Sequence, residues 1–167
     1  MRVLGLVSLA LVLLATSACY RLGSPPTLGE TVRIEVVGNQ GRMPRAQGYF
    51  VDATSRALVN RLGWRVSPTG TATLQVVLHE ERIDAPAQDR RGISTSWSIR
   101  IEGTALLVAR GGSLTGTFTG TGNATGLNTV QGEPEALKAA ATQAADDLVS
   151  WLDAHAGEIS ADARARR

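Results

Sequence analysis

The strongest structural signal in the sequence is residues 93–108, where apolar and polar side chains alternate. Trp97, Ile99 and Ile101 fall on one side of the expected strand, and serines and charged residues fall on the other. This period of two predicts a strand that is buried on one face only. The Gly-Gly pair within residues 109–113 predicts a tight turn into a threonine-rich strand over residues 114–120, anchored by Phe118. The hairpin therefore has one apolar face that other elements must cover.

Two segments have the apolar spacing of helices that can provide this cover. Residues 46–62 are preceded by Pro44 and followed by Gly63, which suit the start and the cap of a helix. Residues 133–155 are rich in alanine along one stripe, with Pro134 expected in the first turn. Both helices are therefore expected to be amphipathic and to pack against the sheet.

The expected order of elements is β-α-β-β-β-α, with the first two strands at residues 31–38 and 73–83. A right-handed crossover makes these two strands parallel, and the next two are antiparallel. We predict an α+β fold, a two-layer sandwich with two helices packed on one face of a four-stranded mixed sheet. Residues 64–66 are expected to form at most a β-like turn, and residues 120–133 a long flexible loop.

The N-terminal residues have the composition of an export signal. Arg2 precedes an apolar run, and three small residues follow it directly before Cys19. The run is too short to cross a bilayer core comfortably as a permanent helix. We predict a signal peptide at residues 1–18 that is removed, a lipidated tether at 19–30, one α+β domain at 31–156 and a flexible tail at 157–167.

Cys19 is the only cysteine, so it can form no disulfide within the chain and no multi-cysteine metal site. Small residues followed by cysteine resemble a bacterial lipobox, in which the thiol is acylated, for example with palmitate. Thr16 stands where the preferred pattern has leucine. An ordinary signal peptide with an incidental cysteine is the alternative, but a lone exported thiol would then be unpaired and reactive. Lipid attachment at Cys19 is the favoured interpretation.

The composition excludes several function classes. The chain has 167 residues, 43% apolar, and a net charge of +2, which describes one globular domain rather than a nucleic-acid-binding protein. His79 and His155 are the only histidines, and their spacing fits no zinc motif. No serine lies in the sharp glycine-flanked turn that a nucleophile requires. We therefore predict no catalytic residue, no metal site, no cofactor and no enzymatic activity.

Four segments together resemble the LptE family, the lipopolysaccharide-assembly lipoproteins of the Gram-negative outer membrane. They are the lipidated cysteine with its flank at 18–23, the first strand at 31–40, the helix at 50–66 and the alternating strand at 71–83. The resemblance implies an outer-membrane lipoprotein on the periplasmic side. Its partners would be lipopolysaccharide and a large outer-membrane β-barrel of the LptD type, which it would plug and help to assemble. The alternative is a periplasmic auxiliary lipoprotein of an envelope lipid transporter.

Two sets of surface residues are candidates for these contacts. The loops after the first two strands carry Arg42, Arg45, Arg90 and Arg91, which the topology brings to one end of the sheet. Guanidinium groups bind phosphates in a bidentate manner, so these arginines are candidates for contacts with lipopolysaccharide. Solvated loop arginines without a ligand are the competing interpretation.

The second set lies on the outer strand of the hairpin. Thr115, Thr117 and Thr119 alternate along one side of a strand with few charges, which lacks the usual protection against edge pairing. We predict that they face the barrel wall, with a merely soluble threonine face as the equal alternative.

Overall fold

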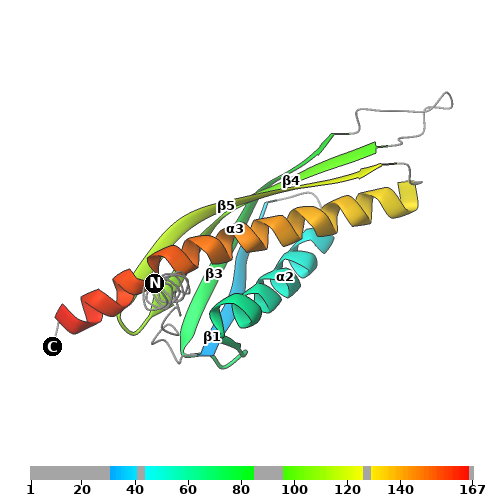
Figure 1. Ribbon diagram of the computed structural model, residues 1–167. Helices are drawn as coiled ribbons and strands as arrows, with labels where there is room; N and C mark the ends of the chain where they lie inside the picture. The colour runs from blue at the N-terminus through cyan, green and yellow to red at the C-terminus, as the bar shows by residue number, and fades with distance from the viewer. Residues whose placement is uncertain (1–30, 41–43, 85–95, 126–128, 166–167) are drawn as a thin grey trace, which may run out of the picture.

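The computed structural model describes residues 31–40, 44–84, 96–125 and 129–165. Two helices and five strands lie in these ranges (Figure 1). In chain order they are β1 (Thr31–Asn39), α2 (Pro44–Leu62), β2 (Arg65–Val66), β3 (Ala72–Asp84), β4 (Ser96–Ala109), β5 (Gly112–Thr125) and α3 (Thr129–Ala165).

The strands form one mixed sheet in the order β2-β1-β3-β4-β5. β1 is parallel to both β2 and β3, whereas β3, β4 and β5 are successively antiparallel. The α+β class, the parallel pair and the antiparallel hairpin are therefore as predicted. The number of strands is not, because the sheet has a fifth strand, β2, where only a turn was expected. Its two residues extend the sheet by pairing with Thr31 and Val32 at the start of β1.

The predicted loop at residues 120–133 is wrong. β5 continues to Thr125 and α3 begins at Thr129, so regular structure occupies most of that range. Glycine and threonine suggested a loop, but the glycines are needed for close packing against α3. Pro134 consequently lies in the second turn of the helix rather than the first.

The second helix also ends later than predicted. α3 extends to Ala165, well beyond residue 155 and into the segment that was expected to be a flexible tail. The added residues are mainly alanine and charged side chains with good helix propensity. They can propagate a helix that is already nucleated.

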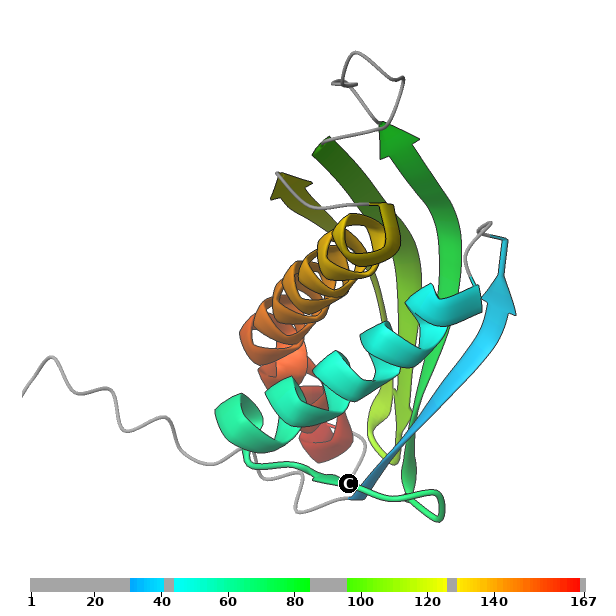
Figure 2. The ribbon, with the colours of Figure 1, turned by 90° about the vertical axis from the view of Figure 1, so that its right-hand side faces the viewer.

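Both helices cover the same face of the curved sheet (Figure 2). α2 contributes large side chains to the interface, and the ring of Phe50 stacks on Phe118 of β5 with centroids 4.8 Å apart. Leu58 and Leu62 continue the buried side of α2 toward its C-terminus. Arg61 then links the two helices, donating to the backbone oxygen of Asp146 at 3.2 Å and to Ser150 Oγ at 3.1 Å.

α3 approaches β5 much more closely, because small residues meet on both elements. A Cβ atom added to Gly120 would lie 2.2 Å from the backbone nitrogen of Ala144. A Cβ added to Gly122 would lie 1.9 Å from the carbonyl oxygen of Ala136. Any side chain at these two positions would collide with the helix backbone. The glycines of β5 thus set the distance between the helix and the sheet.

Two β-bulges bend the sheet on the side of β1 and β3. Val37 is the extra residue in β1, and His79 is the extra residue in β3. Leu78 of β3 pairs with Asn39, the last residue of β1. From there β3 continues for six more residues, the bulge residue His79 among them. Figure 1 shows β4, β5 and α3 continuing past β1 and α2 at this end. The sheet is therefore longer on its antiparallel side.

Candidate interaction surfaces

The outer face of the sheet, opposite the helices, is not covered by any element that the structure describes (Figure 2). Every second residue of β5, from Ser113 to Thr125, points to this outer face, and each of these residues is exposed. Thr115 is paired with Leu106, Thr117 with Thr104, and Thr119 with Glu102. The three candidate threonines therefore share one exposed face, as the alternation predicted. Their contact with a barrel remains a prediction.

The free edge of β5 is partly protected, contrary to the expectation from the sequence. The backbone N–H of Thr119 donates to Asp147 Oδ2 at 3.0 Å, and that of Thr121 donates to Gln143 Oε1 at 2.8 Å. Gln143 and Asp147 are four residues apart, so they share one side of α3. They occupy donors that a further strand would otherwise use.

These two residues are not among the candidates predicted from the sequence. The available signal was the polar pair Gln143 and Asp147 at helical spacing, on the flank of an alanine-rich stripe. Such a pair is typical of any solvated helix face. Only the register between α3 and β5 shows that it caps the edge of a sheet.

Thr115 and Thr117 lie on the same edge but beyond the capped part. In an antiparallel pair, the backbone groups of alternate residues face the partner strand and those of the others face away. Because Thr119 and Thr121 face the edge, Thr115 and Thr117 do so as well. The indole of Trp151 packs on the inner side here, within 2.4–2.6 Å of a Cβ placed on Gly116. Among the described residues, no side chain of α3 caps the backbone N–H of Thr115 or Thr117 in the way that Asp147 and Gln143 cap those of Thr119 and Thr121.

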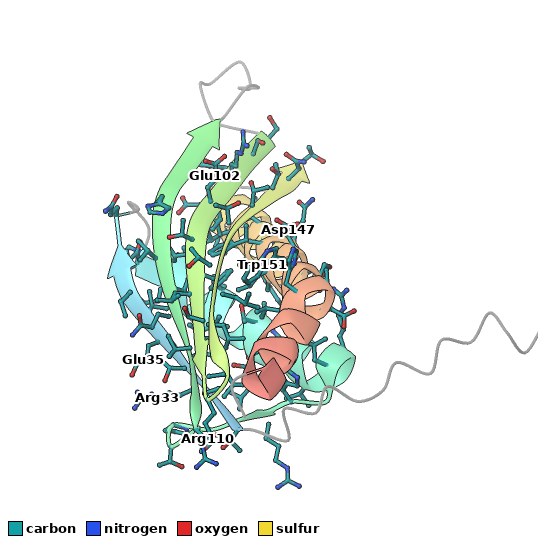
Figure 3. All side chains as sticks on the ribbon, turned by 90° about the vertical axis from the view of Figure 1, so that its left-hand side faces the viewer. Arg33, Glu35, Glu102, Arg110, Asp147 and Trp151 are labelled. Carbon is teal, nitrogen blue, oxygen red and sulfur yellow. The ribbon has the colours of Figure 1, made fainter. Side chains whose placement is uncertain are left out.

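A shallow depression of about 300 Å³ lies beside the capped edge. Polar side chains from β3, β4, β5 and α3 line most of it: His79, Glu102, Thr104, Thr117, Thr119 and Asp147. Glu102 and Asp147 are labelled in Figure 3. His79 Nε2 lies 3.0 Å from Thr104 Oγ1, and Arg100 pairs with Glu102. Within the described ranges, no three histidine, cysteine or acidic residues are placed to hold a metal ion.

The second histidine is explained by local structure. Nδ1 of His155 lies 2.8 Å from the carbonyl oxygen of Trp151, one turn earlier in α3. Because a carbonyl can only accept, Nδ1 carries the proton. The two rings are also stacked, with centroids 5.3 Å apart. The contacts of His155 are therefore local ones within α3, to the backbone and ring of Trp151.

Of the four candidate arginines, the structure describes only Arg45. It is exposed in the first turn of α2. Arg42, Arg90 and Arg91 lie outside the described residues. β1 and β3 point toward the same end, as expected, but β3 ends six residues beyond the partner of Asn39. At the usual rise of a strand this offset is roughly 20 Å, so the two strands end at different levels.

Cys19 also lies outside the described residues, so lipid attachment there remains a prediction. Among the residues described, no helix has the length and apolar character needed to span a bilayer.

No protein-family model matches the chain, and no curated protein sequence matches it significantly. Similar solved structures do exist. The protein XCC0632 from Xanthomonas campestris, described by the family model DUF330, is 14% identical and has a TM-score of 0.51. The match covers 83% of this chain and 92% of that one. This likeness shows a shared fold alone.

Two other similar structures are lipoproteins. A minor lipoprotein from Acinetobacter baumannii is 15% identical over 74% of this chain and 93% of its own, with a TM-score of 0.48. The rare lipoprotein B from Shewanella oneidensis is 8% identical over 77% of this chain and 98% of its own, with a TM-score of 0.46. The structural neighbours thus include bacterial lipoproteins.

Proposed function

We propose that this chain is a non-catalytic, lipid-anchored lipoprotein on the periplasmic side of the outer membrane. It plugs and helps to assemble a large β-barrel of the LptD type, and it assists the insertion of lipopolysaccharide at the cell surface. The observation that carries this proposal is the direct contact between α3 and the glycines of β5. Backbone packed against backbone leaves no space for an acyl chain between these two elements, so they act through their outer surface.

The outer face of the sheet suits the inside of a barrel. Threonines cover the exposed side of β5, and the neighbouring side of β4 adds Thr104 and the Arg100–Glu102 pair. The interior of a large outer-membrane barrel is polar, so a hydroxyl-rich surface can form hydrogen bonds to it. A carrier protein would instead need an apolar cavity to enclose the acyl chains of its lipid.

Affinity purification of the tagged chain from detergent-solubilised outer membrane tests the proposal. A large β-barrel recovered in roughly equal amount, identified by mass spectrometry, is the expected result. Recovery of an inner-membrane transporter would instead favour the auxiliary lipoprotein, and recovery of the chain alone would remove the barrel partner.

Site-specific photocrosslinking locates the contact. A photoreactive amino acid at Thr117, on the outer face of the sheet, should crosslink to the barrel. The same group at Arg56, which is exposed on α2 and pairs with Asp52, is the matched control and should crosslink weakly. Equal crosslinking at both positions would mean that the outer face has no special role.

A further inference from the structure

Three arginines lie at the end of the sheet where β1 begins. Thr31, the first residue of β1, pairs with Arg65 of β2, and Arg33 follows two residues later. Arg33 of β1 is in register with Thr73 of β3, and Thr73 pairs with Val108 of β4. Arg110 comes two residues after Val108, in the β4–β5 turn, so it lies at the same end of the sheet as Arg33. Figure 3 shows Arg33 and Arg110 at this same end, away from Glu102 and Asp147.

Most of this positive charge is not neutralised. Arg65 and Arg110 are exposed, and neither forms an ion pair within the part of the chain that the structure describes. Arg33 is paired with Glu35 at 3.0 Å. Val108 adds an apolar side chain that is 43% exposed. We call these three arginines and Val108 the basic end.

The basic end is also where the tether enters the domain. Eleven residues, 20–30, separate Cys19 from Thr31. Fully extended, they reach at most about 40 Å. If Cys19 carries the lipid, as the proposed function holds, then the end around Thr31 can lie no further than about 40 Å from the lipid anchor. The uncompensated arginines therefore lie at the end of the domain that the tether holds within reach of the bilayer.

We propose that the basic end docks on the anionic phospholipid headgroups of the leaflet that holds the lipid anchor. A tether of this length keeps the domain at a high local concentration near the surface, so a weak attraction is enough. Each arginine near an anionic membrane surface favours binding by about fivefold. In the free lipoprotein, before it enters a barrel, docking in this way would orient the long axis of β4, β5 and α3 away from the bilayer.

The test uses the processed, acylated chain in nanodiscs containing phosphatidylcholine with roughly a quarter phosphatidylglycerol and a headgroup-labelled acceptor lipid, a composition that makes the surface anionic. Cys19 is the only native cysteine and is consumed by acylation, so Ser113→Cys places a single donor dye beside Arg110. Glu135→Cys, on an exposed position near the start of α3, gives the distant reference site. Energy transfer from each dye reports which end faces the lipids.

The matched variants remove the same charge in different places. In the Ser113→Cys chain, R65Q/R110Q should lower the ratio of docked to undocked molecules by about 25-fold. R56Q/K138Q removes two exposed cations elsewhere in the domain and should leave this ratio unchanged. Raising the salt to about 0.5 M should weaken docking of the unmodified domain, because screening shortens the reach of the charges. Circular dichroism confirms that both variants fold.

Several results would overturn the proposal. They are equal transfer in discs of phosphatidylcholine alone, transfer that is unaffected in R65Q/R110Q, and stronger transfer from position 135 than from position 113. Failure of the lipid anchor itself looks different, since the chain would then not enter the discs and Cys19 would react with the dye. That outcome would remove the anchor on which the docking rests.

Discussion

The two helices are attached to the sheet in opposite ways. α2 reaches it with large side chains, as in the stacking of Phe50 on Phe118 at 4.8 Å. α3 lies directly on β5, where alanine backbone meets Gly120 and Gly122. The first interface is filled by side chains that can adjust their rotamers, and the second is limited by backbone atoms that cannot. Loss of volume should therefore damage the α2 side most, and gain of volume the α3 side.

Removing the Phe50 ring should have the largest effect. Phe50→Ala leaves a cavity beside Phe118, and large-to-small changes of this kind cost about 3–5 kcal/mol of unfolding free energy. Urea denaturation followed by circular dichroism measures the loss. Phe50→Leu keeps most of the volume and should cost less than about 1.5 kcal/mol. An equal loss in Phe50→Ala and Phe50→Leu would show that the α2 interface tolerates a change of side-chain shape no better than the α3 interface does.

Adding one methyl group on the other side should be the next most damaging change. Gly122→Ala would place Cβ 1.9 Å from the carbonyl oxygen of Ala136, so the helix must move. Overpacking of this type costs about 1–3 kcal/mol, and the rigid neighbours favour the upper part of that range. The same denaturation assay applies.

Gly48→Ala is the matched control for this change. Gly48 lies in α2 with no atom within 4 Å of an added Cβ. Alanine is the better helix former, so the variant should be more stable by about 0.5–1 kcal/mol. If Gly122→Ala and Gly48→Ala change the unfolding free energy in the same direction, the close contact between α3 and β5 does not control stability.

The contrast between the helices also explains which parts of the fold could be predicted. The period-two pattern of β4 and the amphipathic spacing of α2 are local signals that large apolar residues carry, and both elements appear where expected. The second half of β5 has Gly120, Gly122 and Asn123, which individually favour turns. Their strand conformation depends on a helix that comes later in the chain. Tertiary packing overrides local propensity there, so a loop was predicted.

The candidate surfaces were predictable to a similar degree. The alternation placed Thr115, Thr117 and Thr119 on one exposed face, because strand geometry alone decides that. It could not place Asp147 against the N–H of Thr119, since that contact depends on the register between two elements. The basic end was also missed, because its arginines come from three separate strands and turns and form no cluster in the sequence.

Removing the edge cap should have a smaller effect on stability than either core change. Asp147→Ala removes the acceptor for the N–H of Thr119, which water can then reach, so the expected loss is about 1 kcal/mol. The more informative result is association, since an uncapped edge can pair with another chain. Analytical ultracentrifugation of D147A and of Q143A/D147A should show increasing self-association. Asp153 is an exposed carboxylate further along α3. Asp153→Ala removes the same charge and should not change self-association, so it is the control.

The smallest effect is expected at the contact between the two helices. Arg61 donates to the backbone oxygen of Asp146 and to Ser150, but its side chain is 43% exposed and the ion pair with Asp146 spans 3.7 Å. Exposed pairs of this kind contribute about 0.2–1 kcal/mol, so Arg61→Ala should lower the unfolding free energy by no more than that. A loss as large as that of Phe50→Ala would mean that polar contacts, rather than the stacked rings, hold α2 in place. A double-mutant cycle of Arg61→Ala with Ser150→Ala distinguishes loss of the direct Arg61–Ser150 contact from an indirect effect of the substitution, because only a direct interaction gives a coupling energy.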